Sequence, residues 1–290
     1  MSDKISAICV SYPSRYGLLQ RAIYSFAGQD YKNRELLIGI HDEEYFERVL
    51  SWLDDPRHQD TDLSNVRVLR TEDSHIGQQV VEVFKESSGN YIAVWCDDNL
   101  SHRRRLSMQK DESFEYATVV STSFYYFYDT NELFITDFHQ PGRTLVEKCA
   151  VGSLLVGRDQ FSCASLLAAP ANQHWPSVLV KALANNFPSQ LYRHLRDADY
   201  GFLFMQGVHS DNHRGDTYHR TLGTSLPLTW SREKILSCAD TIDQVLDGYA
   251  FLHDIVEVAG RDAAACVVSG ENIHQWPDWF VSPVLSDVCG

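Results

Sequence analysis

The stretch Asn90-Tyr-Ile-Ala-Val-Trp-Cys-Asp-Asp-Asn99 changes abruptly from apolar residues to two adjacent carboxylates. A buried parallel strand has this pattern when it delivers polar groups to the carboxyl edge of a sheet, where ligands bind. Neighbouring carboxylates repel each other unless a cation or hydrogen-bond donors neutralise them, and hard oxygen ligands suit Mg²⁺ or Mn²⁺. Asp97 and Asp98 therefore predict a site for metal and phosphate chemistry. The alternative is that both acids cap a helix beginning near Ser101, a common use of acids and serines.

The order of elements around this stretch favours the ligand site. Short apolar runs predict strands, and apolar residues at helical spacing predict helices between them. The predicted strands are 5–10, 35–40, 66–69 and the run into Asp97, and the predicted helices are 18–26, 44–53 and 78–85. This alternation predicts an α/β fold with a doubly wound, mainly parallel sheet. Because such connections are right-handed, the strand ends converge on one edge of the sheet.

The second half of the chain changes character. Residues 117–128 and 132–138 are rich in β-branched and aromatic residues, which predicts a hairpin and a small antiparallel part of the sheet. The other predicted elements are strands at 152–156 and 201–205 and helices at 176–184, 231–236 and 242–259. We expect one domain over residues 1–225 and a C-terminal helical extension packed on it over residues 226–290.

The composition is that of a chain with a packed core. Its 290 residues are 44% hydrophobic, and the net charge of -14 argues against a surface built along a nucleic-acid backbone. The basic run Arg103–Arg105 is expected to be a solvated helix face. Seven cysteines without a Cys-x-x-Cys pair argue against a disulfide framework or a zinc knuckle. There is no cleavable leader and no run of about 18 apolar residues, so we expect a soluble protein of a reducing, cytoplasmic compartment.

Five segments in order resemble family 2 glycosyltransferases with the A-type (GT-A) fold. They lie at residues 5–12, 26–38, 73–79, 88–92 and 152–158. In that family a strand ends in an Asp-x-Asp motif that holds a divalent ion against the diphosphate of a nucleotide sugar. Here the motif reads Cys96-Asp97-Asp98, so the first acid is replaced and the last is kept. The resemblance implies a GT-A fold with a nucleotide-binding half over residues 1–100 and an acceptor half over residues 101–225.

The resemblance also implies a donor and a metal. The expected donor is a nucleoside diphosphate sugar, with uridine as the default base. The implied nucleotide-binding residues are Ser11, Tyr12, Arg15, Asp42, His75 and Asp97. Asp98 and His209 are the expected metal ligands, followed by His213, and imidazole ligands favour Mn²⁺ over Mg²⁺. The alternative for these histidines is a polar loop that faces water.

The catalytic base is where the chain departs from the family. Relatives carry an acid in a position that reads Gln173-His174-Trp-Pro176 in this chain. His174 is therefore the candidate base, because the pKa of histidine lies near neutrality. The alternative is that His174 is an ordinary helix-start residue ahead of Pro176. Without a base here, a retaining enzyme or a non-catalytic relative gains weight.

The predicted activity is a metal-dependent, inverting glycosyl transfer of the hexosyltransferase type, with Asp98 as a catalytic residue. The acceptor hydroxyl stays open among a glycan, a lipid-linked sugar, a protein and a modified nucleic acid, and so does the oligomeric state. One rival is a non-catalytic sugar-nucleotide-binding relative. Another is a sugar-phosphate nucleotidyltransferase, which would carry a Gly-rich basic loop after its first strand. The segment Ser11-Tyr-Pro-Ser-Arg15 has no glycine.

Overall fold

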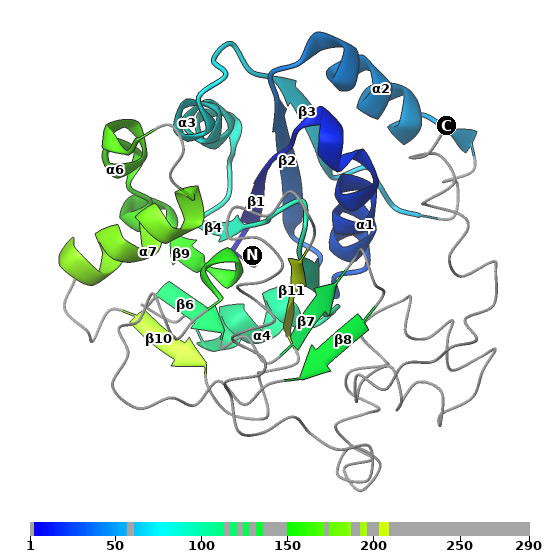
Figure 1. The fold of residues 1–290 in the computed structure, drawn as a ribbon. Coiled ribbons are helices and arrows are strands. Elements are labelled where there is room, and N and C mark those ends of the chain that lie inside the picture. Colours follow the sequence, from blue (N-terminus) through cyan, green and yellow to red (C-terminus); the bar gives the residue numbers. More distant parts are fainter. Residues whose placement is uncertain are drawn as a thin grey trace, which may run out of the picture.

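The main sheet of the protein has seven strands in the order β10-β6-β9-β4-β1-β2-β3 (Figure 1). The computed structural model describes residues 3–56, 61–112, 117–120, 124–127, 132–135, 150–170, 174–186, 192–195 and 203–208. The strands are β1 (Ile5–Val10), β2 (Arg34–Ile40), β3 (Val66–Arg70), β4 (Tyr91–Val94), β6 (Ala117–Val120), β9 (Leu155–Gly157) and β10 (Tyr192–Leu195). Strand β1 pairs in parallel with both β2 and β4, whereas β9 runs antiparallel to β4 and β6.

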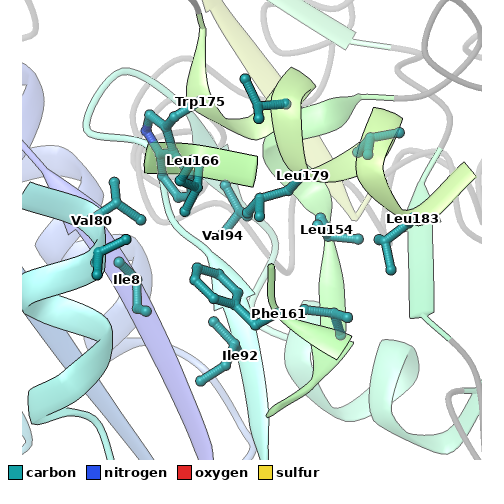
Figure 2. Close-up of a cluster of buried hydrophobic side chains, with 14 of the residues drawn as sticks. Ile8, Val80, Ile92, Val94, Leu154, Phe161, Leu166, Trp175, Leu179 and Leu183 are labelled. Carbon is teal, nitrogen blue, oxygen red and sulfur yellow. The ribbon is translucent and has the colours of Figure 1, made fainter. Parts of the chain in front are cut away.

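Helices cover both faces of this sheet (Figure 1). Helices α1 (Tyr16–Ala27) and α2 (Glu43–Leu53) pack on one face, where Leu19 and Val49 meet alternate residues of β1 such as Ala7. Helices α3 (Ile76–Glu86), α6 (Cys163–Ala168) and α7 (Trp175–Asn186) pack on the other face, in a cluster that includes Ile8 (Figure 2). Strands β1 and β2 are buried along their whole length, as continuous apolar runs predict.

A second sheet has the strand order β5-β11-β7-β8. Its strands are β5 (Leu100–Ser101), β7 (Phe124–Phe127), β8 (Glu132–Ile135) and β11 (Phe204–Val208). The hairpin predicted for 117–128 and 132–138 is therefore wrong in its first arm. Residues 117–120 form β6 of the main sheet, and only β7 pairs antiparallel with β8. The run is divided because β6 and β7 have different partners, β10 and β11, which come from much later in the chain.

The predicted α/β class, with a mainly parallel sheet and a smaller antiparallel part, is confirmed. The predicted extension over 226–290 lies outside the described residues, and the domain boundaries stay predictions. Helix α4 (Arg105–Glu112) begins at Arg105 and not near Ser101. Within the described ranges, no helix is long and apolar enough to cross a membrane.

Two of the family-like segments, 26–38 and 88–92, contain residues that pack against distant loops. The buried side chain of Gln29 donates to the carbonyls of Ser25 and His102 (3.0 and 2.8 Å) and accepts from the Leu106 N–H (3.1 Å). It thereby joins the end of α1 to the start of α4. At Gly89, a Cβ would lie 2.6 Å from the backbone nitrogen of Ser6, so a larger residue would force the backbone to move. These contacts explain both turns without a ligand.

Candidate functional site

The candidate site lies at the carboxyl edge of the main sheet. Strands β2 and β3 lie on one side of β1 and β4 on the other, so the strand order reverses between β1 and β4. Open α/β sheets bind ligands at such a switch point. Ser11 and Tyr12 follow β1 directly, and Asp97 and Asp98 follow β4. The topology thus brings together the residues that the sequence analysis selected from both ends of the nucleotide-binding half.

Asp97 is the buried centre of the site, with 2% of its surface exposed. One carboxylate oxygen accepts from the Arg15 guanidinium at 2.8 Å and the other accepts from the Ser11 hydroxyl at 2.8 Å. The Ser11 hydroxyl also lies 2.9 Å from the hydroxyl of Tyr45. Burial raises the pKa of Asp97 above its ordinary value and the charge of Asp98 adds to this, while Arg15 and Ser11 oppose the rise. Both oxygens of Asp97 are therefore committed to protein donors.

Asp98 makes a longer contact with Arg15 than Asp97 does. One of its oxygens lies 3.4 Å from the same Arg15 nitrogen that bonds Asp97. A charged hydrogen bond of good geometry is shorter, about 2.7–2.9 Å. Two adjacent acids require a cation or hydrogen-bond donors beside them, and the Arg15 guanidinium, 82 residues from Asp97 in the chain, supplies one positive charge. The ion pair of Arg15 with Asp98 is thus longer than its ion pair with Asp97.

Tyr12 and Arg15 are placed by one short turn. The 3₁₀ turn η1 (Pro13–Arg15) follows β1, and the Arg15 N–H donates to the carbonyl of Tyr12 at 2.9 Å. Helix α1 begins with the next residue, so its first turn points at this edge of the sheet. Burial raises the pKa of the partly buried Tyr12 to about 12, and the charge of Asp97 contributes. The phenol therefore stays protonated at neutral pH.

Asp42 and His75 act as helix caps. A side-chain oxygen of Asp42 accepts from the Tyr45 N–H at 2.7 Å at the start of α2. The Nδ1 atom of His75 accepts from the N–H groups of Gly77 and Gln78 at the start of α3, at 3.1 and 3.4 Å. This arrangement requires a lone pair on Nδ1, which leaves the proton of neutral His75 on Nε2. Their assignment as nucleotide-binding residues stays a prediction.

A buried arginine, Arg105, holds the end of β4 from which Asp97 and Asp98 follow. Arg105 is 1% exposed, and its guanidinium donates to the carbonyls of Val94 and Gly152 (2.9 and 3.2 Å) and to the Ser101 hydroxyl (2.8 Å). Its guanidinium carbon lies 4.9 Å from the ring centre of Trp95. The prediction of a solvated basic face is thus wrong for Arg105, although Arg103 and Arg104 are exposed. Arg105 ties the end of β4 to segments of the second half of the chain.

Three residues that shape the site were missed by the sequence analysis. Tyr45 contacts Ser11, Arg105 supports β4, and the Asn99 side chain accepts from the Gly207 N–H at 3.0 Å. This contact of Asn99 continues the pairing of β5 and β11 towards Asp97 and Asp98. Its position directly after the acid pair was the only available signal. Tyr45 and Arg105 gain their roles from partners that are remote in sequence.

His174 is exposed and lies directly before α7. Its Nδ1 atom lies 3.0 Å from the Ser177 hydroxyl, and its carbonyl accepts from the N–H groups of Ser177 and Val178. The next residue, Trp175, packs into the cluster that contains Leu166 and Val80 (Figure 2). These contacts agree with a helix-start role, and the role of a base is not tested by them.

The donor atoms at the site fit a metal only in part. Within the described ranges, no three His, Cys, Asp or Glu side chains come together in a group that could hold a metal ion. The predicted ligands His209 and His213 lie outside those ranges. Asp98 has the hard oxygen that Mg²⁺ and Mn²⁺ prefer, and Asp97 has both oxygens engaged. Asp98 therefore fits as one ligand of a divalent cation, and Asp97 fits as its support.

Comparison with solved structures identifies the fold. No family model and no curated protein sequence matches the chain. The structure is similar to TarS 1–349 of S. aureus in complex with UDP-GlcNAc, at 14% identity and a TM-score of 0.51 over 94% of this chain and 93% of that chain. It is also similar to the mannosyltransferase PcManGT of Pyrobaculum calidifontis in complex with GDP-Man and Mn²⁺, at 12% identity and a TM-score of 0.49 over 100% and 80%. The likeness to TarS confirms the GT-A fold that the sequence motifs predict, and at this identity it shows the fold alone.

Proposed function

We propose that this protein transfers a sugar from a nucleoside diphosphate sugar, with uridine as the first base to test, to a hydroxyl acceptor. The observation that carries this proposal is the pair Asp97 and Asp98 at the switch point, held by Arg15 at 2.8 and 3.4 Å. Two acids and an arginine at the carboxyl edge suit a cation and a diphosphate. The TarS structure, which has the same fold, was obtained with UDP-GlcNAc.

The proposed roles follow from the contacts. Asp98 would hold a divalent cation, with His209 and then His213 as further ligands, and those imidazoles favour Mn²⁺. The bound cation would supply charge stabilisation for the leaving diphosphate. Asp97 keeps Arg15 and Ser11 in place through its two oxygens. Arg15 would then present its positive charge to the leaving diphosphate.

The remaining assignments concern the nucleobase pocket, the catalytic base and the acceptor half. Tyr12 would flank the nucleobase with its protonated phenol, and Asp42 and His75 would border the same pocket from the starts of α2 and α3. His174 would take the proton of the acceptor hydroxyl in an inverting transfer. Residues 1–100 would form the nucleotide-binding half, with the acceptor half extending to residue 225 and the helical extension following it.

One experiment tests the donor class. Thermal unfolding is measured with UDP, GDP, TDP and CMP sugars, each with and without Mn²⁺, because a ligand that binds only the folded state raises the melting temperature. We expect a rise with UDP-sugars that requires Mn²⁺. A melting temperature that no nucleotide sugar changes, with or without the metal, refutes the proposal.

A pair of variants ties the result to the site. Asp98→Asn is expected to lose the Mn²⁺-dependent part of the rise, because an amide is a poorer ligand than a carboxylate. Asp111→Asn removes the same charge from an exposed position on α4 and should respond like the parent protein. Equal responses of the two variants would remove Asp98 from the assignment.

A second candidate function is sugar-nucleotide binding without transfer. It is favoured by the contact of His174 with Ser177, since a helix-start role accounts for His174 without the role of a catalytic base. Binding of a nucleotide sugar without any release of nucleoside diphosphate, with acceptors of all four classes, would favour this candidate. The nucleotidyltransferase alternative loses weight, because the turn Pro13–Arg15 after β1 is a tight 3₁₀ turn.

A further inference from the structure

We propose that Arg15 is an exchangeable counter-cation: it holds both acids in the ligand-free site, releases Asp98 to an incoming divalent cation, and contributes its freed donors to the diphosphate. This inference rests on the proposed function and deepens it. It assigns two successive partners to the Arg15 side chain, first Asp98 and then the diphosphate. It also predicts that removing Arg15 changes metal binding and nucleotide binding in opposite directions.

The first observation is the inequality of the two ion pairs. The Arg15 nitrogen lies 2.8 Å from Asp97 and 3.4 Å from Asp98. Asp97 is further anchored by the Ser11 hydroxyl at 2.8 Å. The contact of Arg15 with Asp97 is therefore the stronger of the two, and the longer contact with Asp98 is the one that an incoming cation would replace.

The second observation is the gradient of exposure across the three side chains. The side chain of Asp97 is 2% exposed, whereas those of Asp98 and Arg15 are 12% and 20% exposed. A ligand arriving from solvent therefore reaches Asp98 and Arg15 and not Asp97. Arg15 can change its outer partner while its inner partner stays in place.

The third observation is the setting of Arg15 in the chain. Arg15 directly precedes α1, a helix of 12 residues with no acidic residue in its first turn. The N–H groups at the start of a helix favour anions, and an arginine beside them adds planar, forked donors for phosphate oxygens. A diphosphate near this turn would meet both groups. The surroundings of Arg15 thus suit an anionic ligand as well as the two acids.

These observations predict that removing Arg15 strengthens metal binding and weakens nucleotide binding. A guanidinium and a metal ion repel each other when both approach Asp98. Without Arg15, the two carboxylates attract a divalent cation more strongly, so the metal alone should bind more tightly. The diphosphate loses a donor, so the nucleotide should bind more weakly even with saturating metal. A purely structural role of Arg15 would weaken both ligands together.

The experiment compares three variants with the parent protein. Arg15→Gln removes the charge, Arg15→Lys keeps the charge without the fork, and Arg67→Gln removes a charge from an exposed ion pair with Glu86. Mn²⁺ alone is titrated by the electron paramagnetic resonance signal of the free ion. UDP is titrated by calorimetry at saturating Mn²⁺. Circular dichroism confirms that each variant is folded.

For Arg15→Gln we expect Mn²⁺ to bind about fivefold more tightly and UDP about tenfold more weakly, with Arg67→Gln like the parent. Arg15→Lys should bind Mn²⁺ like the parent and UDP a few times more weakly. Loss of both affinities by the same factor, or unchanged affinities, overturns the inference. If Arg15→Gln does not fold, Arg15→Lys decides: weaker UDP binding with an unchanged Mn²⁺ affinity supports the inference, and weakening of both affinities together overturns it.

The two proposals fail separately. A parent protein that binds neither UDP nor any nucleotide sugar refutes the proposed function and the diphosphate step of the inference. The Mn²⁺ titration still decides the exchange at Asp98 in that case, because it needs no nucleotide. If the parent binds UDP with Mn²⁺ and Arg15→Gln does not tighten Mn²⁺, the inference alone is wrong.

Discussion

Glu35 lies at the amino end of β2 and ties together three segments far from the candidate site. Its carboxylate accepts from the Lys4 ammonium at 2.8 Å and from the Ser6 hydroxyl at 2.6 Å. It also accepts from the N–H and the hydroxyl of Ser88, at 2.9 and 3.0 Å. The side chain is only 8% exposed. We therefore expect Glu35→Gln to remove a charge that the folded state stabilises strongly.

The expected magnitude follows from the pKa of this carboxyl group. Burial by itself would raise the pKa, but the hydrogen bonds from Lys4, Ser6 and Ser88 lower it from 4.5 to about 2. A carboxyl whose pKa is lower in the folded state stabilises the fold above its unfolded pKa, and the stabilisation is lost as the pH falls towards the folded pKa. This lowering of the pKa contributes about 3 kcal/mol to the free energy of unfolding at pH 7 and about 2 kcal/mol at pH 3.5.

The assay is urea unfolding of the parent and Glu35→Gln at pH 7 and pH 3.5. The difference in the free energy of unfolding should shrink at the lower pH by about 1 kcal/mol. Glu86→Gln is the control, because Glu86 is exposed and its contact with Arg67 is 3.8 Å long. It should change stability by less than about 0.5 kcal/mol at either pH. A difference for Glu35→Gln that is the same at both pH values would refute the argument.

Two further substitutions test the packing that supports the site. Arg105→Met should lower the free energy of unfolding in urea by about 3–5 kcal/mol, because the carbonyls of Val94 and Gly152 lose a buried donor; a loss below about 1 kcal/mol would contradict its supporting role. Gly89→Ala should lower the melting temperature of the protein, since its Cβ would lie 2.6 Å from the Ser6 nitrogen and the turn must move; an unchanged melting temperature would show that the turn yields freely.

The nucleotide-binding half was predictable because its signals are local. Buried parallel strands are continuous apolar runs, and β1 and β2 confirm the ranges 5–10 and 35–40 closely. The division of residues 117–128 was not predictable in this way. Strand β6 pairs with β10 and β9, and β7 pairs with β11 and β8. These strand partners are set by tertiary contacts, which leave no periodic pattern in the sequence of residues 117–128.

The acid pair was predictable, and its environment was not. The position of Asp97 and Asp98 at a strand end follows from the sequence, whereas their pairing with Arg15 depends on two loops meeting in space. The cap formed by Asp42 had a local signal, since an aspartate followed by Glu43 and Glu44 is typical of a helix start. The burial of Arg105 had none, because its aromatic neighbours Trp95 and Phe204 come from separate strand ends.

The charge balance at the switch point explains how a chain with a net charge of -14 could receive an anionic donor. At neutral pH, two ionised carboxylates and the Arg15 guanidinium leave one net negative charge at the site, which repels a diphosphate. A divalent cation on Asp98 would reverse that sign and leave Arg15 beside the incoming anion. Local charges dominate at these distances, because charges elsewhere on the surface are screened within about 8–10 Å in physiological salt. The proposed metal would thus determine whether the nucleotide binds at all, and nucleotide affinity should depend far more steeply on Mn²⁺ than on the total charge of the protein.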